Sequence, residues 1–238
     1  MAGRFPLEGA GMDNLAFGAM AAGLLVAALA LLWQTRRAAV QRSASRAAFF
    51  DGCKALFSDG LKAIAPTGFP RISGRYKGQT FDLQAVPDTL TYRKLPALWV
   101  LVTLPAPMPV RASFDLMIRP GGVAPFSNFH SLPDQITPPD GFPADCAIRS
   151  DDPAHLPDEA LLRRYLPLFQ DARMKELVIS PKGLRLVWLA EEANRGRYLF
   201  FRDAEMGRLA LPASAIRPLL DSLLALQADL AAPMERSA

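Results

Sequence analysis

The side chains that most often carry chemistry are scarce in this chain of 238 residues, which has two histidines and two cysteines. A zinc site takes four well-spaced protein ligands, or three and a water molecule. A site built from His130, Cys146 and His155 would need Asp145 or Asp151 to complete it, and this spacing matches no known ligand pattern. We therefore expect neither a metal nor another cofactor.

Catalytic signatures are equally weak. Cys146 with His130 as its base would be a nucleophile pair without a recognised sequence context. The sequence contains no G-x-S-x-G, no Walker A motif and no G-x-G-x-x-G. Asp151–Asp152 and Glu191–Glu192 are adjacent along the chain, and adjacent side chains do not face one point. The sequence predicts no catalytic residues, and we lean against an enzyme.

The residues best suited to binding lie in one long stretch, residues 119–144, which is rich in proline and glycine. It carries Phe126, Phe129, His130 and Phe142. Loops of this length inside a compact domain are uncommon and often functional, although phenylalanine rings can also simply tie a loop to the core. We regard these four residues as a candidate binding loop.

The first element along the chain, well before this loop, is an uncharged run from Leu15 to Trp33. As a helix, its nineteen residues would be roughly 28 Å long, close to the hydrocarbon thickness of a bilayer. A signal peptide has a shorter apolar core and a small-residue cleavage site, and a soluble core helix normally has a polar face. We predict a transmembrane helix over residues 15–33 and a disordered tail over residues 1–14.

Basic residues predict the orientation of this helix. Arg36 and Arg37 follow it directly, further arginines come next, and only Arg4 precedes it. Because cytoplasmic flanks are enriched in Lys and Arg, we expect the following domain in the cytoplasm and the N-terminus outside. Trp33, Arg36 and Arg37 are then the membrane-interface residues. The predicted location is a bacterial inner (plasma) membrane, spanned once.

One face of the same helix consists of the small residues Gly18, Ala19, Ala22 and Gly23. Small residues four positions apart let membrane helices approach closely. The face is either a helix-packing surface or a consequence of the abundance of Ala and Gly. The expected partners are the lipid bilayer and other inner-membrane proteins.

The charge distribution argues against a nucleic-acid partner. The net charge is +4, of which the first 50 residues carry +3 and the remainder +1. Most of the excess positive charge therefore lies beside the predicted membrane helix, where it indicates orientation, and does not form a patch that would bind phosphates. Cys53 and Cys146 are expected to be reduced in a cytoplasmic domain. With the opposite topology they could form a disulfide.

After the apolar run, the pattern predicts a membrane-proximal helix over residues 34–66. Its apolar stripe recurs at three- and four-residue spacing, at Phe50, Cys53, Phe57, Leu61 and Ile64. Gly52 and Gly60 would each weaken a helix by about 1 kcal/mol relative to Ala. An α+β domain is expected over residues 67–232, followed by a tail over residues 233–238.

Within this domain the pattern predicts a mainly antiparallel sheet with two packed helices. Residues 97–104 read as a central strand, with residues 112–118 as its neighbour. The other expected strands are 71–78, 80–86, 146–149 and a meander of 176–180, 184–189 and 197–202. The expected helices are 157–166 and 214–230.

Three short segments give the sequence a further resemblance. They are Gly74-Arg-Tyr-Lys-Gly78, Asp151-Asp152-Pro153 and Gly183-Leu-Arg-Leu186. Through them the chain resembles uncharacterised bacterial proteins with one membrane span and a small cytoplasmic α+β domain, a resemblance that implies no activity. We expect a membrane-anchored interaction or assembly domain. The alternative is an enzyme, or a ligand- or lipid-binding module, with a site under residues 119–144.

Overall fold

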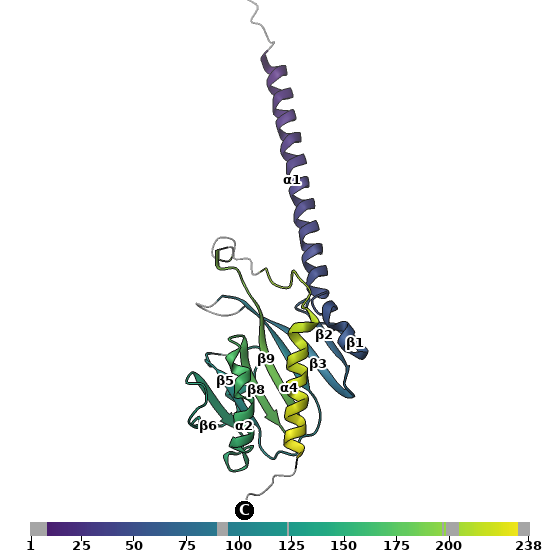
Figure 1. Ribbon diagram of the computed structural model, residues 1–238. Helices are drawn as coiled ribbons and strands as arrows, with labels where there is room; N and C mark the ends of the chain where they lie inside the picture. Colours follow the sequence, from purple (N-terminus) through teal and green to yellow (C-terminus); the bar gives the residue numbers. More distant parts are fainter. Residues whose placement is uncertain (1–8, 90–94, 123, 197, 199–204, 233–238) are drawn as a thin grey trace, which may run out of the picture. The chain divides into compact units, whose positions relative to one another are not determined.

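The computed structural model describes residues 9–89, 95–122, 124–196, 198 and 205–232 (Figure 1). The chain divides into two units, residues 1–44 and 45–238. The first contains most of helix α1 (Gly9–Ala47), and the second contains a nine-stranded sheet with helices α2 (Glu159–Tyr165) and α4 (Ala213–Ala231). The predicted α+β class is confirmed.

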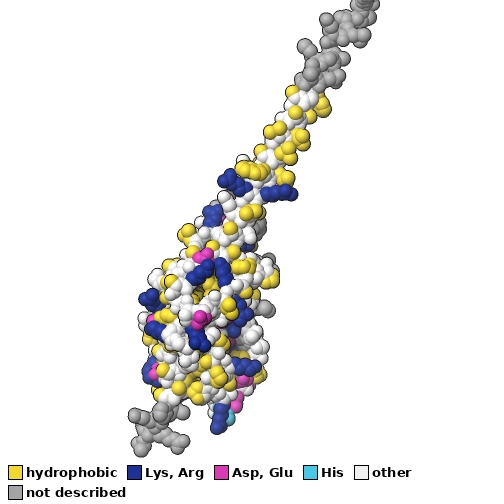
Figure 2. All heavy atoms as spheres, turned by 90° about the vertical axis from the view of Figure 1, so that its right-hand side faces the viewer, with side chains coloured by type: hydrophobic (Ala, Val, Ile, Leu, Met, Phe, Trp, Pro, Cys, Tyr) yellow, Lys and Arg dark blue, Asp and Glu magenta, His cyan; other side chains and the backbone are white. Residues whose placement is uncertain are grey.

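Helix α1 contains the predicted apolar run. It begins at Gly9, so residues 9–14, which we expected to be disordered, are helical. Every side chain from Phe17 to Trp33 is exposed, and the helix is long and apolar enough to cross a membrane. Figure 2 shows apolar side chains along α1 and basic side chains further along it. No described residue covers this apolar surface, which a soluble core helix would require.

Trp33 and Arg37 contact each other at the C-terminal end of the apolar run. The Arg37 guanidinium lies 5.3 Å from the centre of the Trp33 ring. At Gly18 and Gly23 an added Cβ would meet nothing within 4 Å. The small-residue face is therefore open in this structure, and its role as a packing surface stays a prediction.

The predicted helix over residues 34–66 is wrong beyond Ala47. A short 3₁₀ helix, η1 (Asp51–Leu56), is followed by strand β1 (Ser58–Ile64), which pairs with β2. Leu61 and Ile64, which we expected to be buried, are 77% and 51% exposed. Asp59 adopts a positive φ of 54° beside Gly60, and this left-handed backbone is incompatible with a continuing helix.

All strand pairings among the described residues are antiparallel. The strand order across the sheet is β1, β2 (Pro70–Tyr76), β3 (Gln79–Asp88), β4 (Ala97–Leu104), β9 (Gly183–Glu192), β8 (Met174–Ser180), β5 (Phe114–Ile118), β7 (Cys146–Ser150) and β6 (Asp134–Ile136). The β2–β3 hairpin turns at Lys77 and Gly78, with φ of 47° and 84°, as a two-residue turn requires.

One predicted strand pairing is wrong. Strand β4 is central as expected, but its neighbours are β3 and β9, whereas β5 lies between β8 and β7. The β8–β9 hairpin occupies the space in which we expected β5. Strand β9 is hydrogen-bonded to β4 along one edge and to β8 along the other. The third meander strand, predicted over 197–202, lies outside the described residues except for Tyr198.

The two faces of the sheet are covered differently. Helices α2 and α4 lie over one face, where they enclose the main core (Figure 1). The buried stripe of α4 is Ile216, Leu219, Leu220, Leu223 and Leu226, as predicted. On the opposite face, residues of the 119–132 segment cover a smaller core that includes Leu101, Met117 and Val187. We call this second side the loop face.

Candidate functional site

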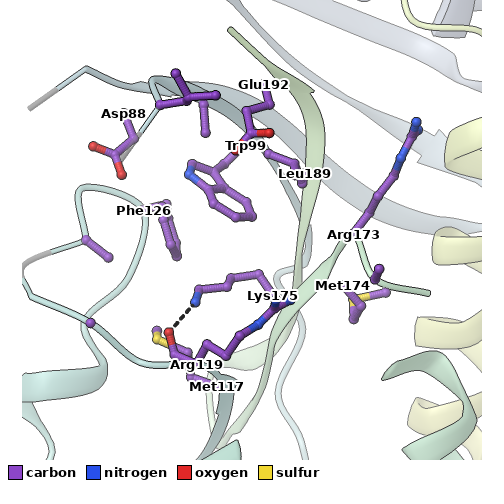
Figure 3. Close-up of a pocket in the computed structure, with 15 residues that line it drawn as sticks. Asp88, Trp99, Met117, Arg119, Phe126, Arg173, Met174, Lys175, Leu189 and Glu192 are labelled. Atoms are coloured by element: carbon purple, nitrogen blue, oxygen red, sulfur yellow. Dashed lines mark hydrogen bonds between the residues drawn. The ribbon is translucent and has the colours of Figure 1, made fainter. Parts of the chain in front are cut away.

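A cavity of about 540 Å³ lies on the loop face, beneath the first part of the predicted binding loop. Its walls come from β3, β4, β5, β8 and β9 and from residues 119–126 of the loop, among the described residues. Figure 3 shows these side chains. A volume of this size is typical of pockets that bind small molecules.

The floor of the cavity is aromatic. Trp99 and Phe126 have ring centres 4.7 Å apart, with 44° between the ring planes. Trp99 belongs to β4, in which Leu98 and Val100 point to the main core and Trp99 and Leu101 to the loop face. Strand β4, which we predicted as a central strand, therefore supplies side chains to both faces of the sheet. One of these side chains, Trp99, forms part of the cavity floor.

The indole nitrogen of Trp99 is buried and has no hydrogen-bond partner among the described residues. A buried tryptophan N–H ordinarily finds an acceptor, and leaving one without costs about 1–3 kcal/mol. For comparison, Trp188 on the other face donates from Nε1 to Asp171 at 2.9 Å. The Trp99 N–H is thus an unsatisfied donor on a residue that lines the cavity.

Charged side chains lie on either side of the Trp99 ring. In Figure 3, Asp88 and Glu192 lie on one side and Lys175 and Arg119 on the other. The Lys175 ammonium donates to the backbone carbonyl oxygens of Ile118 and Arg119, the latter at 2.8 Å. These bonds hold the positive charge at the cavity wall.

The four predicted loop residues do not form one site. Phe126 lines the cavity, and Phe129 is buried in the small core of the loop face. Phe142 is buried in the main core, and His130 is exposed. The rings therefore tie different parts of the segment to different cores, because the segment passes from one face of the sheet to the other.

The hypothetical Cys146–His130 pair is wrong. Cys146 packs against the main core, together with Ile148 of the same strand, whereas His130 contacts the Phe129 ring on the loop face. Among the described residues, no three His, Cys, Asp or Glu side chains lie close enough to hold a metal ion. Both cysteines are free, and burial raises the pKa of the Cys53 thiol to about 12.

A carboxyl pair on the loop face was missed by sequence reasoning. Asp115 of β5 and Glu176 of β8 are only 3% and 1% exposed. The register pairs Asp115 with Val178 and Met117 with Glu176, so the two carboxyl groups are diagonal neighbours on one face. Burial raises the pKa of Asp115 to about 9 and also raises the pKa of Glu176. The pair therefore retains a proton at neutral pH.

The only local signal for this pair is a single acidic residue within each of two strands, Phe114–Ile118, which is otherwise apolar, and Met174–Ser180, which is mainly apolar. The sequence separation of the two residues hides their proximity. Ser127 of the loop donates a hydrogen bond to Glu176 Oε1 and accepts one from the Phe129 N–H at 2.9 Å. The serine thus joins the loop to the carboxyl pair.

No family model, curated protein or solved structure matches this chain. The resemblance to single-span bacterial proteins therefore stays a prediction.

Proposed function

We propose that this chain is a membrane-anchored binding domain whose ligand occupies the cavity beneath residues 119–126. The observation that carries this proposal is the unpartnered, buried Trp99 N–H in the wall of a cavity of about 540 Å³. This is the ligand-binding alternative of the sequence analysis, and we place it ahead of the interaction domain because a built cavity supports it.

The cavity favours a small amphiphile. Trp99, Phe126 and Met117 offer an apolar surface for an aromatic or acyl body, and the Trp99 N–H requires an oxygen or nitrogen acceptor on it. Lys175, together with Arg119, which is also ion-paired with Asp145 at 3.3 Å, favours a negative charge at one end. An aryl or acyl carboxylate combines these three features.

The experiment measures binding of 2-naphthoate, a water-soluble aryl carboxylate, to the full chain in amphipol by ligand-observed NMR. Trp99→Phe retains the ring but removes the N–H, so we expect affinity to fall about two- to tenfold, the value of one hydrogen bond. Trp188→Phe is the matched control, since its indole lies on the other face. Absence of saturable binding, or equal affinity for both variants, would refute the proposed function.

The proposed location is a bacterial inner membrane, with α1 spanning it, the N-terminus outside and the sheet unit in the cytoplasm. The exposed apolar surface of α1 and the arginines that follow it support this orientation. A fluorescent protein and alkaline phosphatase, each fused to the C-terminus, test it. We expect fluorescence from the first and no phosphatase activity from the second, and the reverse pattern would contradict the orientation.

The interaction domain remains a second candidate function, favoured by the edge strand β1. All of its side chains are exposed, and Leu61 and Ile64 are apolar. An open strand edge with apolar side chains is a typical surface for another inner-membrane protein. A photo-crosslinking residue at position 61 in native membranes should capture one defined partner, whereas one at Gln135, exposed on the opposite edge strand, should not. Equal labelling from both positions would count against this function.

A further inference from the structure

The register of the sheet brings six residues, five of them polar, from six strands into one row across the loop face. Successive Cα partners are Arg149, Asp115, Val178, Arg185, Thr103 and Asp82. Neighbouring strands lie about 4.8 Å apart, so such a row places charges at regular intervals on one surface. Neither the ligand cavity beneath residues 119–126 nor the main core includes any of these residues.

Two adjoining cavities open above this row. One, of about 240 Å³, is lined by both Asp115 and Glu176, and the other, of about 540 Å³, extends toward β2 and β3. They share Asn128, Val178, Ser180 and Arg185 as lining residues. Because Arg185 lines both cavities and the carboxyl pair lines one, the row presents a cation and an acid pair to a common space.

Arg185 is placed to bind an anion. Among the described residues its guanidinium makes one hydrogen bond, from Nε to Thr103 Oγ1 at 3.2 Å, and its positive charge also acts on the Asp115 and Glu176 carboxyl groups, whose pKa values it lowers. The planar fork of an arginine matches a carboxylate, which it binds through two parallel hydrogen bonds.

The carboxyl groups of Asp115 and Glu176 hydrogen-bond to each other, but each keeps one oxygen without a partner. Among the described residues, Asp115 Oδ1 and Glu176 Oε2 are buried without a hydrogen bond, and both side chains line the smaller cavity and are more than nine-tenths buried. Unpaired acceptors in such a place carry a cost that a ligand with several N–H groups would remove. A bound ammonium group has three such donors and the complementary charge.

We propose that this row is a second binding site, which takes a small zwitterion of the α-amino acid class. Its carboxylate pairs with Arg185, and its ammonium group donates to Asp115 and Glu176. Ser113, Ser131 and Asn128 at the rim of the smaller cavity provide neutral hydrogen-bonding groups for the side chain of the ligand. The proposal goes beyond the amphiphile cavity, with which this site shares no lining residue.

The test is a thermal-shift screen of the full chain in amphipol with each standard L-amino acid, followed by titration of those that stabilise it. The analogues L-lactate and ethylamine separate the two ends of L-alanine, because each retains only one charged group. We expect at least one amino acid to raise the melting temperature, and its hydroxy-acid and amine analogues to raise it less. No stabilisation by any amino acid, or an equal effect of the hydroxy acid, would overturn the proposal.

Variants locate the site. Arg185→Gln should weaken binding at least about tenfold, and Arg185→Lys, which retains the charge without the fork, should weaken it less. Glu176→Gln is isosteric and should also weaken binding, which keeps the test open if Arg185→Gln fails to fold. Arg75→Gln is the control, as Arg75 is exposed on the same face outside both cavities. Unchanged binding in folded Arg185→Gln protein would refute the site.

The same titrations separate this proposal from the proposed function. Trp99→Phe should leave amino-acid binding unchanged, and Arg185→Gln should leave 2-naphthoate binding unchanged. Competition between the two ligands would contradict the assignment of two separate sites.

Discussion

The Asp115–Glu176 pair illustrates how burial controls the chemistry of single residues here. Both carboxyl groups are buried in the sheet, and water does not reach the Asp115 Oδ1 and Glu176 Oε2 atoms. Ionising both would place two like charges in a poorly solvated space, so the pair retains a proton. Arg185 lowers the pKa of both groups without restoring their usual values.

This raised pKa predicts how stability depends on pH. An unfolded aspartate titrates near 3.8, whereas the folded-state pKa of Asp115 is about 9. Between these values the folded chain holds a proton that the unfolded chain has released, so this group makes the free energy of unfolding fall as pH rises, by at most about 1.4 kcal/mol per pH unit. Asp115→Asn cannot ionise, so its stability relative to wild type should increase from about pH 5 to about pH 9.

Urea unfolding followed by near-ultraviolet circular dichroism at several pH values measures this difference. Asp134→Asn, on an exposed position of edge strand β6, is the control and should show no such trend. A constant difference between Asp115→Asn and wild type across this range would show that Asp115 is ionised in the folded chain.

Ser127 predicts a second effect at the residue scale. Ser127→Ala removes the donor to Glu176 and the acceptor for the Phe129 N–H, and should destabilise the fold by about 1–3 kcal/mol. Hydrogen exchange at the Phe129 amide should accelerate in the variant. Ser131→Ala is the control, since the Ser131 hydroxyl bonds only to the Asn128 carbonyl oxygen at an exposed position. Equal exchange at Phe129 in both variants would contradict the role of Ser127.

At the scale of elements, the segment after α1 shows how tertiary contacts override helical periodicity. Phe50 is buried as the stripe predicts, and so is its neighbour Phe49, but Gly52 lies against the backbone of Leu211. The Leu211 N–H donates to the Phe49 carbonyl oxygen at 2.7 Å, and the Cys53 thiol donates to the Leu211 carbonyl oxygen at 3.2 Å. This contact requires a residue without a side chain at position 52.

Gly52→Ala distinguishes the predicted helix from the observed contact. In an exposed helix the substitution would stabilise by about 1 kcal/mol. Here the new Cβ would lie 2.5 Å from the Leu211 carbonyl oxygen, so the contact must open and the melting temperature should fall. Gly60→Ala is the matched control, because an added Cβ there meets nothing within 4 Å. A higher melting temperature for Gly52→Ala would favour the helix.

For the whole molecule, α1 carries the prediction about location. Aspartate at the centre of a membrane helix costs about 2.5–3.5 kcal/mol. Replacing Leu24 and Leu25 together by Asp should therefore release the chain from membranes under carbonate extraction. Val40→Asp is the control, since Val40 is also exposed on α1 but lies beyond the apolar run. Retention of the double variant in the carbonate-resistant fraction would contradict the transmembrane assignment.

Local patterns predicted the elements that depend on local contacts. The α4 stripe, the β2–β3 hairpin with its Lys77–Gly78 turn and strand β4 all have a clear sequence period or turn. The neighbours of β5 were not predictable in this way, because strand order depends on how distant hairpins pack. The candidate site was predicted only in part, through Phe126, since Trp99 reads as an ordinary strand residue until the loop lies over it.

The sequence by itself therefore determined the apolar helix, its flanking arginines and the α+β class, because these depend on hydrophobic length, charge and period. The tertiary structure alone decided which residues share a surface. Phe126 meets Trp99, Asp115 meets Glu176, and Cys146 is separated from His130, since antiparallel register and the two faces of the sheet join residues far apart in the chain. Sites for binding arise from that juxtaposition, which no local pattern contains.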